Sequence, residues 1–213
     1  MTTPAPPAPT ASADGRVARG ERTRRVIAEA LIALLQEGDP QPTARRVAER
    51  AGVSLRLVFH HFDDMEQVLQ AAVDVQLQRH WNQLHPVDKA LPLGERVARL
   101  VHQRSSVYQA IAPVRRAAMV NEATSSVLRE QLQTGRQQLR TQLDFLLDAE
   151  AHRAGPAAAD LLDSIEALTS FEVWDQLRRR QGKSQDAAET LMTAMVGAVL
   201  ADHGIESSTG RET

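Results

Sequence analysis

Pairs of apolar residues recur every four positions in the first third of the chain. The pairs are Val26/Ile27, Ala30/Leu31 and Leu34/Leu35. This spacing puts all of them on one wide face of a helix and predicts an amphipathic helix over residues 19–37. Gly38 is a typical residue just beyond a helix end, and Pro40 and Pro42 prevent the helix from continuing.

Two short helices are predicted directly after this break. Thr43 can cap the first helix, Gly52 ends it, and Ser54 can cap the second, which has the sequence SLRLVFHH. Two short helices joined by a turn of three or four residues that contains a glycine form a helix-turn-helix pattern. The helix at residues 19–37 is expected to pack across both.

The remaining chain shows only helical patterns, without strand alternation or repeats. Helices are predicted over about residues 64–83, 93–111, 125–153, 157–181 and 185–203, with a short one starting at Pro113. We therefore expect an all-α protein with a three-helix N-terminal domain and a larger domain of about six helices. The expected divisions are 1–15 (a disordered arm rich in Pro, Ala, Ser and Thr), 16–64, 65–205 and 206–213 (a frayed tail).

Composition and charge narrow the classes of function. The absence of cysteine excludes disulfides, thiolate zinc sites and cysteine nucleophiles. No apolar run approaches the roughly 18 residues of a membrane span, and the N-terminus lacks signal-peptide features, so we expect a cytoplasmic protein. Nine arginines and six acids give residues 1–62 a charge of +3, which leaves −5 for the rest of a chain whose net charge is −2. This asymmetry favours an anionic partner for the N-terminal part alone.

The second short helix has an unusual outward surface. Val58 and Phe62 are four residues apart and should face the core, so that Arg56 and His60 lie roughly opposite. Apolar side chains flank these two, namely Leu55, Leu57 and Phe59. A solvated face would carry Glu, Lys or Gln instead. In the major groove of DNA, an arginine can contact guanine and an aliphatic side chain a thymine methyl group.

The segment RTRRVIAEALIALLQEG, followed by PTARRVAERAGVSLRLVFHHFDDMEQVLQAAV, resembles the DNA-binding domain of the TetR (tetracycline-repressor) family of bacterial regulators over about residues 19–73. The motif AxRRVAERAGVSxxxVFxHFxxxExVL carries this resemblance, and the rest of the chain agrees only in its layout of helices. The resemblance implies a homodimeric transcription regulator. Such a protein is typically a repressor that a small-molecule ligand releases from a pseudo-palindromic DNA operator.

Four residues depart from the family pattern. Phe59 and Met65 stand where the family usually has a Tyr and a Lys that contact phosphate, so those contacts cannot be made. Arg56 replaces a small residue and Leu57 a Thr. Our hypothesis is that Arg56 contacts bases while arginines elsewhere supply affinity for phosphate. The expected DNA-binding residues are Thr43, Arg45, Ser54, Leu55, Arg56, Leu57, Phe59, His60, Arg16 and Arg19.

Polar and aromatic residues interrupt the apolar stripes of the second domain. Arg104 occupies such a stripe, where a buried and unpaired guanidinium would be costly. It therefore either pairs with an acid (Glu150, Glu166 or Glu172) or contacts a ligand. The candidate ligand-binding residues, which should converge on any pocket, are Trp81, Arg104, Tyr108, Asn121, Glu122, Thr169, Glu172 and Trp174. The two tryptophans also suit a core position.

The last predicted helix, 185–203, is apolar over most of its circumference. A terminal helix in a small domain cannot bury two faces against its own chain, which predicts a homodimer with a four-helix interface. The expected interface residues are Leu191, Ala194, Met195, Ala198 and Val199. A central buried helix in a monomer is the alternative. In a dimer, two recognition helices would lie about one turn of B-DNA apart.

Other classes of function fit less well. His60 and His61 point about 100° apart on a helix, so they do not readily share a metal ion with Asp63 and Asp64. The segment DDMEQ lacks the second acid of a magnesium-binding motif. No nucleophile–base pair or phosphate loop is present, so neither cofactor, metal nor catalysis is expected. An all-α enzyme or binding module with a vestigial helix-turn-helix is the alternative, and an architectural DNA binder would need a more basic body.

Overall fold

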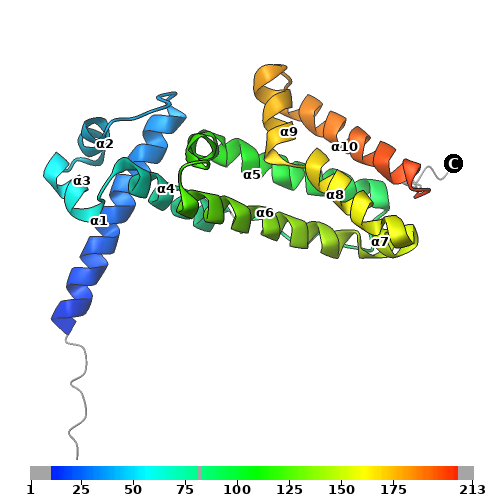
Figure 1. Cartoon of the computed structure of the whole chain (residues 1–213), viewed down its shortest axis with the longest axis horizontal. Coiled ribbons are helices and arrows are strands. Elements are labelled where there is room, and N and C mark those ends of the chain that lie inside the picture. The colour runs from blue at the N-terminus through cyan, green and yellow to red at the C-terminus, as the bar shows by residue number, and fades with distance from the viewer. Residues whose placement is uncertain (1–10, 81–82, 206–213) are drawn as a thin grey trace, which may run out of the picture. The chain divides into compact units, whose positions relative to one another are not determined.

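The structure, a computed structural model, describes residues 11–80 and 83–205, with side chains from Val17 onward. Within these ranges every regular element is helical, which confirms the predicted all-α class (Figure 1). The chain divides into two compact units, Met1–Leu77 with Pro113–Asn121 and Gln78–Ala112 with Glu122–Thr213. No helix in the described part of the chain is long and apolar enough to cross a membrane. The domain boundary at residues 64–65 stays a prediction, because the compact units divide within the next helix.

The first unit contains α1 (Ala11–Gln36), α2 (Ala44–Ala51), α3 (Leu55–His61) and most of α4 (Met65–His80). Helices α2 and α3 both pack against α1, as Figure 1 shows. Deeply buried side chains come from all four helices and the residue after α3, and they include Ile27, Ala28, Leu31, Ile32, Val47, Val58, Phe62, Val68 and Ala72. The predicted three-helix arrangement is thus present, with α4 completing its core.

Helix α1 begins earlier than predicted. It starts at Ala11 instead of near position 19, so the last five residues of the predicted arm lie in the helix. The physical reason is that no proline lies between Pro9 and Pro40, and residues 11–19 contain alanines and arginines that favour helix. The rest of the predicted arm and the predicted tail at 206–213 lie outside the described residues.

The second unit contains most of α5 (Leu93–Asn121), then α6 (Ser126–Leu146), α7 (Asp148–Ala154), α8 (Ala158–Leu168), α9 (Phe171–Asp175) and α10 (Gln185–Asp202). A short 3-10 turn at Gly155–Ala157 precedes α8, and a π-helical turn at Gln176–Arg180 follows α9. Helix α8 packs against α6, α7 and α10 and is therefore central to this unit.

Three of the predicted helices have different ends. Pro113 lies inside α5 instead of starting a helix, because the loss of one backbone hydrogen bond is outweighed by the buried residues on both sides, Ala112 and Val114. The helix predicted over 125–153 is interrupted at Leu147. The helix predicted over 157–181 is interrupted at Ser170, whose Oγ accepts a hydrogen bond from the backbone N–H of Val173 (3.3 Å) and caps α9.

Candidate nucleic-acid interface

Hydroxyl side chains begin both helices of the helix-turn-helix, as predicted. The backbone N–H of Arg46 donates to Thr43 Oγ1 (3.4 Å), and that of Leu57 donates to Ser54 Oγ (3.2 Å). Both caps have extended backbone and fix where α2 and α3 start. Because both residues are exposed, each hydroxyl can still donate its own proton to a phosphate oxygen.

The turn between α2 and α3 depends on a glycine. Gly52 has φ +67°, in the left-handed region that side chains with a Cβ rarely adopt. Its N–H donates to Glu49 O and the N–H of Val53 donates to Ala48 O (3.0 Å), so the last carbonyls of α2 are satisfied. The turn therefore sets the angle at which α3 leaves α2.

Arg24 of α1 holds the far end of α3. Its Nη1 donates to the backbone carbonyl of His61, and its guanidinium carbon lies 4.1 Å from the ring centroid of Phe62. A cation at the carbonyl end of a helix is favourable, and so is a cation over an aromatic ring. His61 is half-buried in this contact, and burial, with the charges of His60 and Arg24, lowers the pKa of its imidazole. Helix α3 is thus fixed at both ends.

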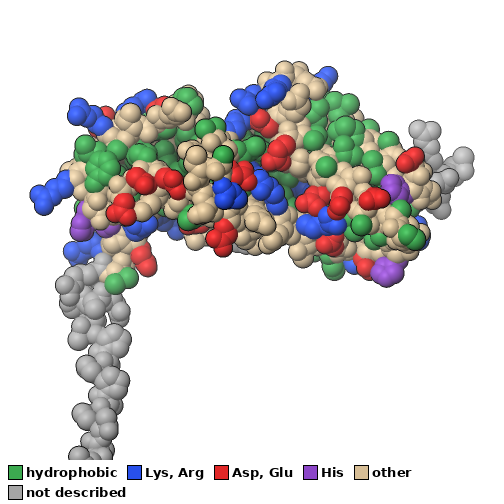
Figure 2. All heavy atoms as spheres, in the orientation of Figure 1, with side chains coloured by type: hydrophobic (Ala, Val, Ile, Leu, Met, Phe, Trp, Pro, Cys, Tyr) green, Lys and Arg blue, Asp and Glu red, His purple; other side chains and the backbone are tan. Residues whose placement is uncertain are grey.

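Helix α3 carries five of the ten residues predicted to bind DNA. Leu55, Arg56, Phe59 and His60 are exposed, whereas Leu57 is half-buried and turned partly toward the unit. Outside α3, the predicted contacts Arg19, Thr43, Arg45 and Ser54 are exposed as well. The side chain of Arg16 lies outside the described residues. Figure 2 shows hydrophobic side chains on the surface over α3, with basic side chains beside them.

The arginines of α1, α2 and α3 whose side chains are described fall into two groups. Four have acceptors within the unit: Arg24 (His61 O), Arg25 (Glu29), Arg46 (Asp39) and Arg50 (Glu37). Among the described residues, Arg19, Arg22, Arg45 and Arg56 have no such acceptor. Three of these, Arg19, Arg45 and Arg56, are predicted to contact DNA, and each can offer its charge to an external anion.

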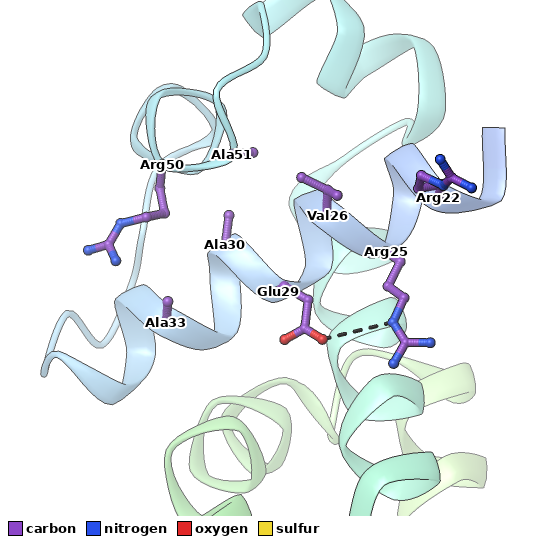
Figure 3. Close-up of a pocket in the computed structure, with 8 residues that line it drawn as sticks. All are labelled: Arg22, Arg25, Val26, Glu29, Ala30, Ala33, Arg50 and Ala51. Carbon is purple, nitrogen blue, oxygen red and sulfur yellow. Dashed lines mark ion pairs between the residues drawn. The ribbon is translucent and has the colours of Figure 1, made fainter. Parts of the chain in front are cut away.

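A groove between α1 and α2 lies on the same unit (Figure 3). It has a volume of about 390 Å³ and is lined by Arg22, Arg25, Val26, Glu29, Ala30, Ala33, Arg50 and Ala51. Arg25 lies 3.9 Å from Glu29 in the ion pair drawn in Figure 3, and the hydrogen bond from Arg50 lowers the pKa of Glu37. Two of its three arginines are thus engaged within the unit, so the groove offers less free charge than the face of α3.

The acidic segment DDMEQ forms the start of α4. Asp64 Oδ1 accepts a hydrogen bond from the backbone N–H of Gln67 (2.9 Å), and Gln67 Oε1 accepts one from the backbone N–H of Asp63 (3.1 Å). The Asp64 side chain thus caps the first turn of α4, and the Gln67 side chain bonds the residue before that cap. In the described ranges, no three His, Asp or Glu side chains are placed to hold a metal ion.

In the second unit, four of the predicted ligand-binding residues meet in one buried cluster. Arg104 is 1% exposed and donates to three neutral oxygens, Thr169 Oγ1 (2.6 Å), Leu139 O (2.5 Å) and Gln142 Oε1 (3.3 Å). Tyr108 Oη donates to Thr169 O (2.9 Å), and Trp174 Nε1 donates to the hydroxyl of Ser105 (3.0 Å). Phe171 completes the cluster, with its ring centroid 5.6 Å from those of Tyr108 and Trp174.

Arg104 makes no ion pair within the described residues, so the predicted pairing with an acid is wrong. Its candidate partners are engaged elsewhere, Glu150 with Arg96 (2.7 Å) and Glu166 with Arg140 (2.7 Å). Burial lowers the pKa of Arg104, and the nearby Tyr108 and Glu166 oppose that shift. The neutral acceptors suffice because Thr169 ends α8, where the helix dipole is negative.

The other predicted ligand-binding residues do not join this cluster. Asn121 belongs to the first unit and donates to Ala117 O (2.8 Å). Glu122 pairs with Arg136 (2.9 Å), and Glu172 is exposed in the first turn of α9. Trp81 lies outside the described residues.

Gln76 of α4 is a polar residue that sequence reasoning missed. Its side chain is 3% exposed, yet neither Oε1 nor Nε2 has a hydrogen-bond partner among the described residues. The sequence signal for its burial is its position among the apolar residues Val73, Val75 and Leu77. A buried amide without partners is unfavourable, so its presence calls for an explanation.

Helix α10 has two apolar faces. One face is buried in its own unit through Ala188, Met192, Val196 and Leu200. The residues predicted for the dimer interface are exposed or half-exposed: Leu191, Ala194, Met195, Ala198 and Val199. The alternative of a helix buried all round therefore does not describe this chain.

Comparison with known proteins places the helix-turn-helix in a family. The family of bacterial regulatory proteins called tetR matches residues 27–72. No curated protein matches the sequence significantly. The fold is similar to that of a tetR-family transcriptional regulator from Streptomyces coelicolor (TM-score 0.71, 18% identity, 86% of this chain and 82% of that one). It is also similar to a transcriptional regulator from Rhodococcus sp. Rha1 (TM-score 0.67, 23% identity, 84% and 96%).

The matched segment begins within α1 and ends within α4, so it covers the whole helix-turn-helix and its core. Both structural matches cover more than four fifths of this chain and extend over its C-terminal helices. Residues 27–72 therefore match the family of bacterial regulatory proteins called tetR, and the chain is similar in fold to solved transcriptional regulators.

Proposed function

We propose that this protein is a homodimeric repressor that binds a pseudo-palindromic DNA operator through α3 and is released by a small-molecule effector. The observation that carries DNA binding is the unpaired charge of three exposed arginines in the first unit. Arg19, Arg45 and Arg56 have no acidic partner in that unit, whereas Arg25, Arg46 and Arg50 pair with acids. Arginines held free of internal pairs suit phosphate and guanine.

Dimerisation is supported by the second apolar face of α10. Leu191 is 38% exposed, and the alanines beside it allow a partner helix to approach closely. An isologous contact along this face gives two-fold symmetry, which a palindromic operator would match.

The effector is the part of the proposal that rests on Gln76. Its unpartnered amide can accept one hydrogen bond and donate two, so it suits a ligand that offers a donor and an acceptor side by side, such as an amide or a carboxylic acid. The Arg104 cluster is already satisfied internally and needs no ligand. An effector would release DNA only by binding the DNA-free conformation more tightly than the bound one.

Selection of duplexes from a random pool by the purified full-length protein tests this function. We expect enrichment of one palindromic sequence whose half-sites are separated by about one helical turn. Absence of any enriched sequence at low salt would overturn the proposal. It would favour the alternative of a helical enzyme or binding module, for which no described group of residues provides support.

A further inference from the structure

The outward face of α3 consists of two parallel rows of side chains. Leu55 and Phe59 form one row and Arg56 and His60 the other, because residues four apart lie above one another on a helix. Leu55 is 38% exposed and Phe59 50%. We call the row formed by Leu55 and Phe59 the apolar row. Half of this short helix's exposed face therefore carries no hydrogen-bonding group.

The apolar row is not needed for packing within the unit. Val58 and Phe62 supply the contact of α3 with the core, each only 1% exposed, and Leu57 and His61 are half-buried beside them. Large hydrophobic side chains left in water lose the gain of burial. A pair of them one turn apart on a seven-residue helix is therefore a surface that gains from being covered.

The chemistry of the apolar row restricts what it can recognise on DNA. Leucine and phenylalanine cannot donate to phosphate or pair with the polar edges of bases, and Phe59 lacks the phenol oxygen of a tyrosine. In the major groove only thymine presents an apolar group, its 5-methyl. Two side chains four residues apart on a helix are separated by about 6 Å, close to two base-pair steps of about 3.4 Å.

We propose that Leu55 and Phe59 recognise the methyl groups of two thymines, about two base pairs apart, in each half-site of the operator. This inference rests on the proposed function. It adds that part of the operator sequence is recognised by apolar contact, while the neighbouring Arg56 can donate hydrogen bonds to a guanine. DNA is favoured over a protein partner as the occupant because two exposed arginines, Arg56 next to the row and Arg45 on the preceding helix, have no internal acidic partner.

The test removes single methyl groups from the enriched operator by replacing one thymidine at a time with deoxyuridine. The protein is unaltered, so no change in folding can confuse the result. Burial of one methyl contributes about 0.8 kcal/mol. We therefore expect uracil in place of a contacted thymine to weaken binding about fourfold at constant salt. Thymines outside the half-sites serve as controls and should tolerate uracil. A cytosine placed at a contacted position should bind better when it is 5-methylated.

Variants then assign each methyl to a side chain. In Leu55→Ala, replacing the thymine that Leu55 contacts by uracil should no longer weaken binding, whereas uracil at the other contacted thymine should still do so. Phe59→Ala should show the converse. Phe59→Leu keeps an apolar side chain, so uracil at the thymine that Phe59 contacts should still weaken binding, but less than in the wild type. Because these residues are exposed, the variants should unfold at the wild-type temperature.

The outcomes separate this inference from the function on which it rests. Failure to enrich any duplex would overturn the regulator itself and this inference with it. An enriched operator that tolerates uracil throughout its half-sites would overturn only the recognition of methyl groups. Uracil effects that persist unchanged in both alanine variants would likewise overturn the assignment to the apolar row.

Discussion

At the scale of single residues, two polar side chains lie in apolar surroundings and differ in how they are satisfied. Arg104 is surrounded by three neutral oxygens and links α5, α6 and the end of α8. Gln76 has no such partner in the described part of the chain. Arg104 therefore acts as a structural residue of the second unit, whereas Gln76 costs stability without a ligand.

Replacing Gln76 by leucine tests this difference. We expect Gln76→Leu to stabilise the ligand-free protein by about 1–2 kcal/mol, because an apolar group of similar shape removes the unpaired donor and acceptor. The matched control is Gln67→Leu on the same helix, which should destabilise because it removes two hydrogen bonds between the Gln67 side chain and Asp63 (3.1 and 2.8 Å). Thermal unfolding measures both, and a loss of stability in Gln76→Leu would show that this amide has a structural partner.

The free arginines of the first unit should divide into two roles. Arg45→Ala should weaken binding to all duplexes alike and reduce the slope of log K against log salt by about 0.9, as expected for one lost phosphate contact. Arg56→Ala should instead relax the preference at one base pair by about 1–3 kcal/mol. Arg46, paired with Asp39, is the control and should matter less. If Arg56→Ala weakens every sequence equally and lowers the slope, Arg56 contacts only phosphate.

At the scale of elements, the position of α3 depends on a contact with α1. Arg24→Ala removes the hydrogen bond to His61 O and the contact with the Phe62 ring, so we expect a loss of about 0.5–1.5 kcal/mol in stability. Arg22, on the same helix and without a partner in the described residues, is the control. Chemical denaturation compares the two variants. Equal stability of Arg24→Ala and Arg22→Ala would mean that core packing alone fixes α3.

The same elements show which features were accessible to sequence reasoning. Thr43, Gly52 and Ser54 were predicted correctly, because caps and turns depend on neighbours a few residues away. Pro113 and Leu147 misled the prediction, because packing determines whether a helix continues past them. The contact between Arg24 and His61 joins positions 37 residues apart and could not be found from spacing. The exposed placement of Arg56 and His60 followed from helical periodicity alone.

At the scale of the whole molecule, dimerisation determines whether two copies of α3 can read one operator. Each chain has a mass of 23.4 kDa, and light scattering at micromolar concentration should give twice that value. Ala198→Arg places a charge in the exposed apolar face of α10, so it should yield monomers that keep their helices. Gln133→Arg on the exposed side of α6 is the matched control.

The monomeric variant should also bind the operator far more weakly than the control, because each half-site must then be bound independently and the gain from linking the two recognition helices is lost. Binding to an isolated half-site should change little, since α3 and its contacts with α1 lie in the first unit and do not include α10. A wild-type protein that scatters as a monomer, or an Ala198→Arg variant that remains dimeric, would place the interface elsewhere. Full operator affinity in a verified monomer would show that one copy of α3 is sufficient for recognition.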